Sequence, residues 1–256
     1  MSAIQLQPGI IYCPVLSRRL GRSLGINLLP TNCKVCSFDC IYCQYGEAKP
    51  SNKVPMEGVL PIVDDVLSAV EKAFNKPRTI ENVTFSGNGE PTLHPDFHEI
   101  VVEIKKIQHK LRPEARLAIL SNGSKINDPN VFSALKLMDK PMMKLDAGDE
   151  NTFRLINRGI KTIRLNEIVE GLKRLPNLLI QSMLIDGEIS NIKGYAYESW
   201  AEVLGALQPR EVHIYSVDRP TAKGKIKCVS PVDLQRIEED LNTRFNLNVQ
   251  AFWREK

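Results

Sequence analysis

Short apolar segments alternate with amphipathic helical segments along most of this chain. Residues 83–87 (VTFSG) form a strand-like run, while segment 61–74 places Val63, Leu67 and Phe74 on one helical face. Because parallel strands need crossover connections and are buried on both faces, this alternation predicts a parallel sheet covered by helices. The predicted fold class is α/β. The six expected strands lie within residues 25–29, 83–87, 116–123, 142–148, 178–187 and 211–220.

Unusual residues follow the predicted strands at their carboxyl ends. A cysteine-rich loop comes after the first strand, and the segments GNGEP (87–91), SNG (121–123) and KLDAG (144–148) come at the next three strand ends. An open doubly wound sheet and a complete or partial barrel both fit the pattern, and both place function at these ends. The sequence therefore predicts one site there.

Composition and charge describe an ordinary globular chain. Hydrophobic residues make up 43% and charged residues 25%, and the net charge of +4 permits a nucleic-acid partner without indicating one. The first residues lack a signal-peptide pattern, and no apolar run is long enough to span a bilayer. We expect a cytoplasmic protein without a membrane partner. We expect a single domain over residues 1–256, with a core at about 20–220 and a helix and strand extension at about 228–256.

Four cysteines crowd the loop in the spacing Cys33-x2-Cys36-x3-Cys40-x2-Cys43. Structural zinc sites usually separate two close pairs by a dozen or more residues, and ferredoxin-type clusters use C-x2-C-x2-C with a remote fourth cysteine. The remaining option is a [4Fe–4S] cluster held by Cys36, Cys40 and Cys43, which leaves one iron without a protein ligand.

The spacing C-x3-C-x2-C, with aromatic Tyr42 before the last cysteine, resembles the signature of the radical S-adenosylmethionine (radical SAM) superfamily. Further segments extend the similarity to the branch related to wyosine-type tRNA-modifying synthases: residues 17–27, 85–97, 120–123, 143–159 and 213–220. The resemblance implies a partial (β/α)6 TIM-like barrel. It also implies an oxidoreductase-like iron–sulfur enzyme in which a reduced [4Fe–4S] cluster cleaves S-adenosylmethionine to a 5′-deoxyadenosyl radical. The radical would take hydrogen from an unidentified RNA base, small metabolite or peptide, and the electron would come from an external donor such as flavodoxin or ferredoxin.

The same resemblance assigns cofactor contacts. Asn88, Gly89 and Glu90 stand where the superfamily has Gly-Gly-Glu, which binds the methionine amino group. Lys144 is expected to neutralise the methionine carboxylate, with a purely structural ion pair to Asp146 as the competing interpretation. The predicted cofactor-binding residues are Tyr42, Asn88, Gly89, Glu90, Ser121, Asn122, Lys144 and Asp146.

Other residues have no assigned role. Arg18, Arg19 and Arg22 form a basic patch that would suit a phosphate or carboxylate, or simply a solvated loop. Wyosine synthases carry three further upstream cysteines for a second cluster, whereas only Cys13 and Cys33 precede the predicted ligands here. Unless Cys228 folds back to join them, a second cluster of that type is missing, which places the specific wyosine reaction in doubt. Cys228 lies far away in the sequence.

Two other classes of protein compete with the enzyme. An iron–sulfur electron carrier would need four cysteine ligands and would lose its cluster on Cys33→Ala, while a zinc-stabilised binding module would be colourless. The enzyme interpretation predicts that Cys33→Ala is tolerated.

Overall fold

The computed structural model describes residues 4–48, 60–217 and 226–254. The chain divides into two compact units. The N-terminal unit comprises Gln5–Ser37 and Glu47–Pro141, and the C-terminal unit comprises Met1–Ile4, Phe38–Gly46 and Met142–Lys256. The single domain expected over residues 1–256 stays a prediction.

Four strands form the sheet of the N-terminal unit, in the order β1-β2-β3-β4. Strands β1 (Ile11–Ser17) and β2 (Gly21–Ile26) make an antiparallel hairpin. Strands β3 (Asn82–Phe85) and β4 (Arg116–Ser121) continue the sheet in parallel. Every residue of β3 is buried, as expected of a parallel strand covered on both faces.

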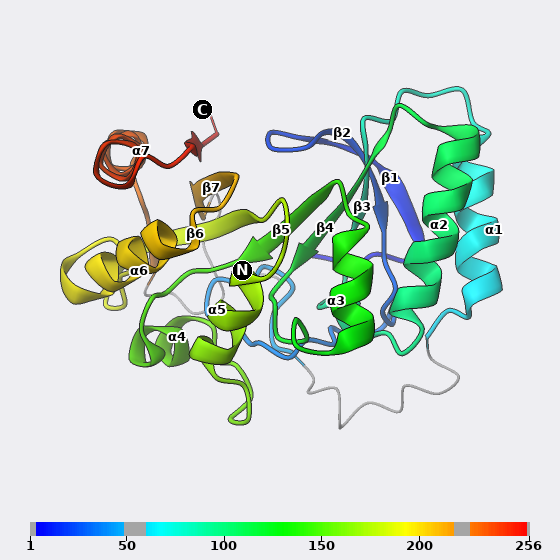
Figure 1. The fold of residues 1–256 in the computed structure, drawn as a ribbon. Helices are drawn as coiled ribbons and strands as arrows, with labels where there is room; N and C mark the ends of the chain where they lie inside the picture. The colour runs from blue at the N-terminus through cyan, green and yellow to red at the C-terminus, as the bar shows by residue number, and fades with distance from the viewer. Residues whose placement is uncertain (1–3, 49–59, 218–225, 255–256) are drawn as a thin grey trace. The chain divides into compact units, whose positions relative to one another are not determined.

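Three helices pack beside one another in the N-terminal unit, with α2 (Phe97–Leu111) between α1 (Val63–Phe74) and α3 (Pro129–Lys136) (Figure 1). Four apolar residues of α2 are buried: Phe97, Ile100, Val101 and Ile104. Phe97, at the start of α2, meets Phe85 of β3 edge-on, with 5.8 Å between ring centroids. The apolar face that the sequence pattern predicts for this helix therefore packs against the sheet.

The sheet of the C-terminal unit has the order β5-β6-β7-β9, with parallel pairing of β5 to β6, β6 to β7 and β7 to β9. A short strand, β8 (Ile226–Cys228), pairs antiparallel with the end of β6. The four parallel strands are β5 (Lys140–Lys144), β6 (Leu179–Gly187), β7 (Glu211–Ser216) and β9 (Val249–Phe252).

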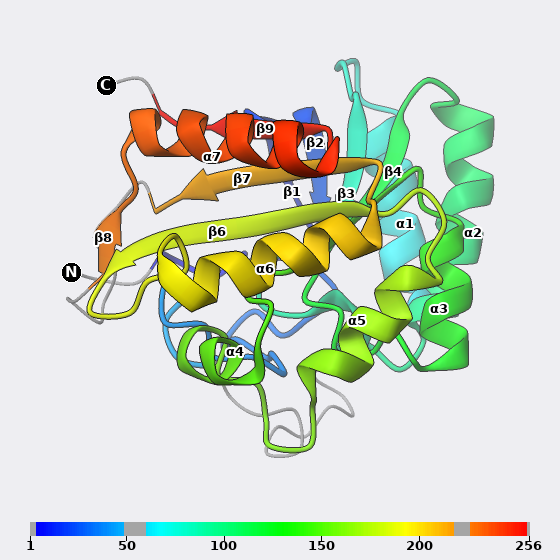
Figure 2. The ribbon, with the colours of Figure 1, turned by 60° about the vertical axis from the view of Figure 1, so that its left-hand side comes forward.

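Helices α6 and α7 lie side by side along strands β6, β7 and β9 (Figure 2). Trp200 of α6 is fully buried, and its Nε1 donates to the carbonyl of Leu145 at 2.9 Å. Asp149 is the N-cap of α4 and its side chain accepts from Thr152 N, and Ser230 is the N-cap of α7 and its side chain accepts from Asp233 N. The helices of this unit are α4 (Glu150–Ile156), α5 (Leu165–Lys173), α6 (Gly194–Leu207) and α7 (Pro231–Phe245).

The α/β fold class and the six predicted strands are confirmed, with shifted ends. The strand expected at 25–29 runs from Gly21 to Ile26, because it pairs with β1, which the sequence analysis missed. The last three residues of the predicted strand 211–220 lie outside the described residues. Among the helices that the structure describes, none is both long enough and apolar enough to cross a bilayer.

Candidate functional site

The cysteine loop passes from one unit to the other. Cys33 and Cys36 belong to the N-terminal unit, and Cys40 and Cys43 belong to the C-terminal unit. None of the four is in a disulfide. Among the described residues, no three His, Cys, Asp or Glu side chains are already grouped as a metal site. The role of Cys36, Cys40 and Cys43 as cluster ligands therefore stays a prediction.

Cys40 is anchored to the end of α4. The backbone N–H groups on either side of it, of Asp39 and Ile41, donate to the carbonyls of Asn157 and Ile156 at 3.0 and 2.9 Å. Its Sγ accepts a hydrogen bond from Asn157 Nδ2 at 3.5 Å. Burial raises the pKa of the Cys40 thiol, against the opposing effects of Lys144 and of the Asn157 hydrogen bond.

An apolar cluster in the C-terminal unit surrounds this part of the loop. Ile41 and Tyr42 are buried against Ile156, Ile185 and Val217, and Cys40 packs on the same cluster. Such an apolar setting limits the access of water to the half-buried thiol and strengthens nearby electrostatic interactions.

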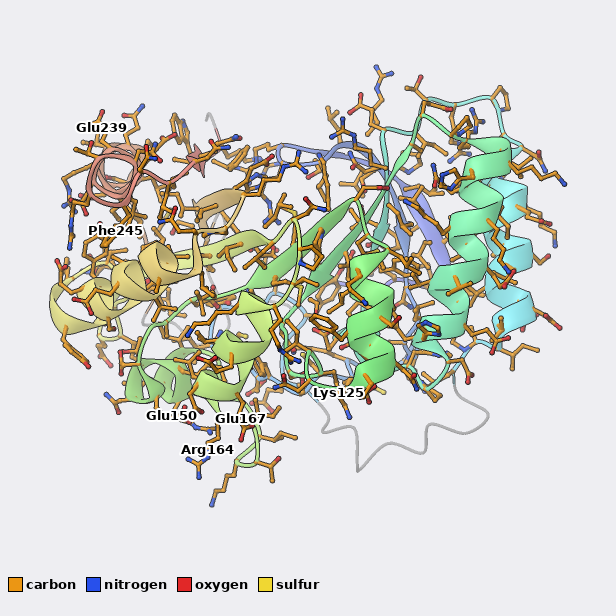
Figure 3. All side chains as sticks on the ribbon, viewed as in Figure 1. Lys125, Glu150, Arg164, Glu167, Glu239 and Phe245 are labelled. Atoms are coloured by element: carbon orange, nitrogen blue, oxygen red, sulfur yellow. The ribbon has the colours of Figure 1, made fainter. Side chains whose placement is uncertain are left out.

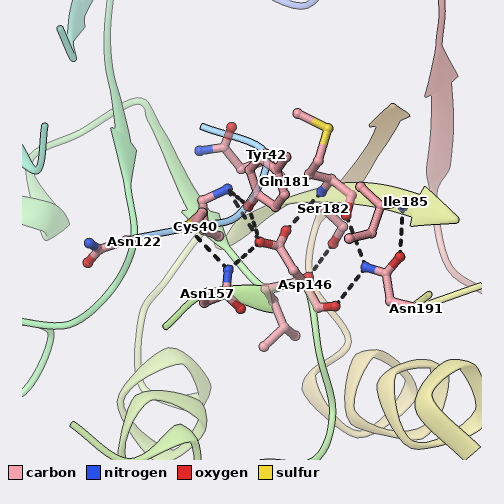
Figure 4. Close-up of polar contacts among 12 residues, drawn as sticks. Cys40, Tyr42, Asn122, Asp146, Asn157, Gln181, Ser182, Ile185 and Asn191 are labelled. Atoms are coloured by element: carbon pink, nitrogen blue, oxygen red, sulfur yellow. Dashed lines mark hydrogen bonds and ion pairs between the residues drawn. The ribbon is translucent and has the colours of Figure 1, made fainter. Parts of the chain in front are cut away.

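Tyr42 connects the loop to the end of β5. Its hydroxyl donates to Asp146 Oδ2 and accepts from Lys144 Nζ at 2.8 Å (Figure 4). Lys144 Nζ also lies 3.5 Å from Asp146 Oδ2 and 5.1 Å from the centre of the Tyr42 ring. Burial and the negative charge of Asp146 raise the pKa of Tyr42 well above its usual value, so the phenol stays protonated. The ion pair that competed with a cofactor role for Lys144 is thus present.

Asp146 receives several hydrogen bonds from the C-terminal unit. Its Oδ1 accepts from the backbone N–H of Met183 on β6 at 2.8 Å, and Oδ2 accepts from Asn157 Nδ2 at 2.6 Å. Its backbone carbonyl accepts from Asn191 Nδ2 at 2.9 Å (Figure 4). This carboxylate therefore fixes the relative positions of the cysteine loop, β6 and α4. Contact of Asp146 and Tyr42 with S-adenosylmethionine stays a prediction.

Glu90 is a buried, hydrogen-bonded carboxylate in the N-terminal unit, as Asp146 is in the C-terminal unit. Its Oε1 accepts from Ser121 Oγ at 2.8 Å and from Thr92 Oγ1 at 2.7 Å, and its Oε2 accepts from Asn122 N at 2.6 Å. Burial raises the pKa of Glu90, although each of these hydrogen bonds lowers it. The predicted residues Glu90, Ser121 and Asn122 are thus brought together as one hydrogen-bonded group.

Asn88 and Gly89 hold the loop segment before Cys36. Val35 N donates to the Asn88 carbonyl, and Glu90 N donates to the Val35 carbonyl, both at 3.0 Å. The fully buried side chain of Asn88 donates to the carbonyls of Gln7 and Pro30 at 3.0 and 2.9 Å. These bonds give a structural reason for asparagine where the superfamily has glycine.

Cys36 has a hydrogen-bond donor of its own in the N-terminal unit. Asn122 Nδ2 donates to Cys36 Sγ at 3.5 Å and to Ser37 Oγ at 2.9 Å. Amide donors to sulfur favour the thiolate form that metal binding requires. The donor chemistry at Cys36 and Cys40 therefore fits an iron–sulfur cluster.

The unassigned residues lie in several places. Arg18 and Arg22 are exposed and Arg19 is half-buried, all on the β1–β2 hairpin. Cys33 is half-buried, Cys228 is exposed on β8, and the side chain of Cys13 lies outside the described part of the chain.

A separate groove in the C-terminal unit is charged. Glu150 of α4, Arg164 just before α5 and Glu167 of α5 approach one another there (Figure 3). No residue predicted for the site is among those described as lining the groove.

Asn157 and Asn191 are the site residues that the sequence analysis missed. Asn157 lies within the segment 143–159 that carries the resemblance. An asparagine at the end of a helix, however, carries no signal that its side chain points toward a cysteine far away in the sequence.

Residues 33–207 match the family described as "Radical SAM superfamily". A UPF0026 protein of Helicobacter pylori (strain ATCC 700392 / 26695) is 35% identical over 221 residues, 84% of this chain and 68% of that protein. A protein named GTPase Obg from Brachyspira hyodysenteriae (strain ATCC 49526 / WA1) is 28% identical over 94% of this chain. The chain spans 35% of that relative's length.

Several solved structures have folds similar to that of this chain. A radical SAM methyltransferase from Sphaerobacter thermophilus matches with a TM-score of 0.63 at 16% identity, over 91% of this chain and 67% of its own. Streptococcus suis SuiB bound to S-adenosylmethionine matches with a TM-score of 0.64 at 16% identity, over 90% of this chain and 50% of its own. TYW1 with a lysine-pyruvate adduct matches with a TM-score of 0.59 at 19% identity, over 87% of this chain and 74% of its own.

These similarities bear out the predicted fold, an α/β partial (β/α)6 barrel. The family model covers well over half of the chain, and the radical SAM family is one of enzymes. The chain therefore belongs to the radical SAM superfamily and is a homologue of the UPF0026 proteins.

Proposed function

We propose that this chain is an iron–sulfur enzyme that binds a [4Fe–4S] cluster through Cys36, Cys40 and Cys43. With the cluster bound and reduced, one electron would cleave S-adenosylmethionine to a 5′-deoxyadenosyl radical, which takes hydrogen from a substrate. The observation that carries the proposal is the C-x3-C-x2-C spacing inside the region that matches the radical SAM family.

The cysteine environments support this assignment. Cys36 and Cys40 are four residues apart, so the chain limits their Cα separation to about 14 Å whatever its conformation. Each sulfur accepts a hydrogen bond from a buried asparagine amide, that of Asn122 or Asn157. Ligation would remove the proton that burial otherwise retains on Cys40, since only the thiolate is a metal ligand.

The proposed contacts with S-adenosylmethionine are those that the family resemblance assigns. Lys144 offers a cation to the methionine carboxylate, and Glu90 with the backbone of Gly89 offers acceptors to the amino group. The other proposed contacts are Tyr42, Asn88, Ser121, Asn122 and Asp146. The S-adenosylmethionine bound in the SuiB structure supports a cofactor of this kind.

The electron would come from an external donor such as flavodoxin or ferredoxin, because the chain has only three cysteines outside the proposed ligand set. The substrate class is an RNA base, a small metabolite or a peptide. A reducing compartment such as the cytoplasm suits the crowded thiols.

The test is anaerobic. The protein is reconstituted with iron and sulfide, reduced with dithionite and given S-adenosylmethionine, and 5′-deoxyadenosine is measured by mass spectrometry. We expect product from the wild type and from Cys228→Ala, which changes an exposed thiol on β8, and none from Cys40→Ala. A clustered wild type that forms no product, even with cell extract supplied as a source of substrate, would overturn the proposal.

A further inference from the structure

The side-chain amide of Asn157 faces two acceptors in the C-terminal unit. Its Nδ2 lies 2.6 Å from Asp146 Oδ2 and 3.5 Å from Cys40 Sγ (Figure 4). Since an amide nitrogen carries two hydrogens, both contacts are made by donation from Asn157. Asn157 is 1% exposed, so water does not compete for these hydrogens.

Asp146 determines which way this amide points. A carboxylate only accepts hydrogen bonds, and the same Oδ2 also accepts from the Tyr42 hydroxyl. Turning the amide of Asn157 over would place its Oδ1 against the Asp146 carboxylate oxygen, which can only accept. The buried carboxylate therefore keeps the N–H of Asn157 directed at Cys40.

The backbone of Asn157 is held as firmly as its side chain. Its N–H donates to the Phe153 carbonyl at 2.9 Å at the end of α4, and its carbonyl accepts from Asp39 N at 3.0 Å. Asp146 is fixed in turn by the backbone N–H of Met183. The donor at Cys40 is thus positioned before any cluster binds.

We propose that Asn157 is a positioning residue whose N–H, oriented by Asp146, raises the reduction potential of a cluster ligated by Cys40. This inference rests on the proposed function. Reduction adds one electron, supplied by the external donor, and no atom is transferred. A hydrogen bond to a ligand sulfur stabilises the more negative, reduced state more than the oxidised state, so the potential rises.

The experiment compares two isosteric substitutions in the reconstituted protein. Asn157→Leu keeps the approximate shape of the side chain and removes the donor. Asn242→Leu, the matched control, removes an amide that bonds only to backbone atoms of Val249 among the contacts described, at 3.4 and 2.8 Å. The midpoint potential of the cluster is measured by a redox titration monitored by electron paramagnetic resonance, with dithionite as reductant.

At a fixed solution potential, we expect Asn157→Leu to reduce the ratio of reduced to oxidised cluster about tenfold. For a one-electron couple, this corresponds to a fall of about 59 mV in the midpoint potential. Asn242→Leu should leave the potential unchanged. If Asn157→Leu fails to fold, as judged by circular dichroism, Asn157→Ala takes its place, with the same expected direction.

Two results would overturn the inference in different ways. A wild type that incorporates no cluster would remove the proposed function together with this inference. A wild-type cluster whose potential does not change on replacement of Asn157, or changes equally in Asn242→Leu, would overturn only the role of Asn157.

Discussion

A β-carbon added to Gly89 would lie 1.7 Å from the carbonyl oxygen of Val35. The two residues form an isolated parallel β-bridge, so the main chain leading to Cys36 packs directly on the main chain after β3. Gly89 also has a φ of +146°, a conformation that other residues rarely adopt. The absence of a side chain at this position therefore sets the course of the cysteine loop.

Replacement of Gly89 by alanine should be severely destabilising. The added carbon must displace backbone atoms in addition to the strained φ, so we expect a loss of more than about 3 kcal/mol in the free energy of unfolding. The measurement is urea unfolding of the apoprotein. Gly194→Ala is the control, because Gly194 also has a positive φ, of +56°, but no atom lies within 4 Å of an added β-carbon. A loss at Gly89 no larger than that at Gly194, about 1–2 kcal/mol, would contradict the packing argument.

Single cysteine substitutions should separate the proposed ligands from the other thiols. We expect Cys36→Ala, Cys40→Ala and Cys43→Ala each to abolish the cluster, because removal of one of three thiolates leaves too few ligands to retain it. Cys33→Ala should keep it. Iron and sulfide content and the visible absorption spectrum after reconstitution provide the measurement. Loss of the cluster in Cys33→Ala would favour an electron carrier with four cysteine ligands over the enzyme.

The pattern of strands and helices predicted most of the fold because strands that are buried on both faces are mostly apolar in sequence. The continuous apolar run of β4, residues 117–120, is typical of a parallel strand covered on both faces. The hairpin strand β1 was missed for a physical reason. Val15 and Leu16 on β1 are exposed, so this strand lacks the burial pattern on which the other predictions depend.

The site was only partly predictable. Cysteine spacing is local in the sequence and indicates a chemistry directly, whereas the partners of Asp146 come from segments far apart in the chain. Tyr42 and Asp146 are separated by 104 residues and Asn122 and Cys36 by 86. Such contacts depend on the register of the strands and on where α4 ends, which propensity and periodicity do not determine.

The stability contributed by Glu90 should depend on pH. Burial raises the pKa of Glu90 in the folded protein above its ordinary value of 4.5. At a pH between 4.5 and the folded pKa, the folded state therefore binds more protons than the unfolded chain. The contribution of Glu90 is therefore greatest below pH 4.5 and falls as the pH rises through the folded pKa.

We expect the difference in unfolding free energy between the wild type and Glu90→Gln to become smaller as the pH is raised from 4.5. Urea unfolding of the two apoproteins at a series of pH values measures it. Glu99→Gln, an exposed change on α2, controls for the loss of one negative charge. A difference that grows with pH would mean that the hydrogen bonds from Ser121, Thr92 and Asn122 outweigh burial.

Removal of Lys144 should reveal whether its ion pair with Asp146 supports the fold. Asp146 has a fully buried side chain and Lys144 is 17% exposed, so Lys144→Met would leave a buried carboxylate without its cation. Breaking a buried pair costs about 3–5 kcal/mol. We expect a loss at the lower end of this range, because Tyr42, Asn157 and Met183 still donate to the carboxylate.

The same substitution separates the two roles of Lys144, since its ion pair exists without S-adenosylmethionine. If Lys144 served only the methionine carboxylate, Lys144→Met would weaken cofactor binding and leave the unfolding of the apoprotein unchanged. Lys193→Met is the matched control, because Lys193 pairs with Asp186 at 2.7 Å on the surface, where such pairs contribute at most about 1 kcal/mol. A large loss of apoprotein stability for Lys144→Met alone, together with weaker binding of S-adenosylmethionine by calorimetry, would mean that one ammonium group both supports the fold and binds the cofactor.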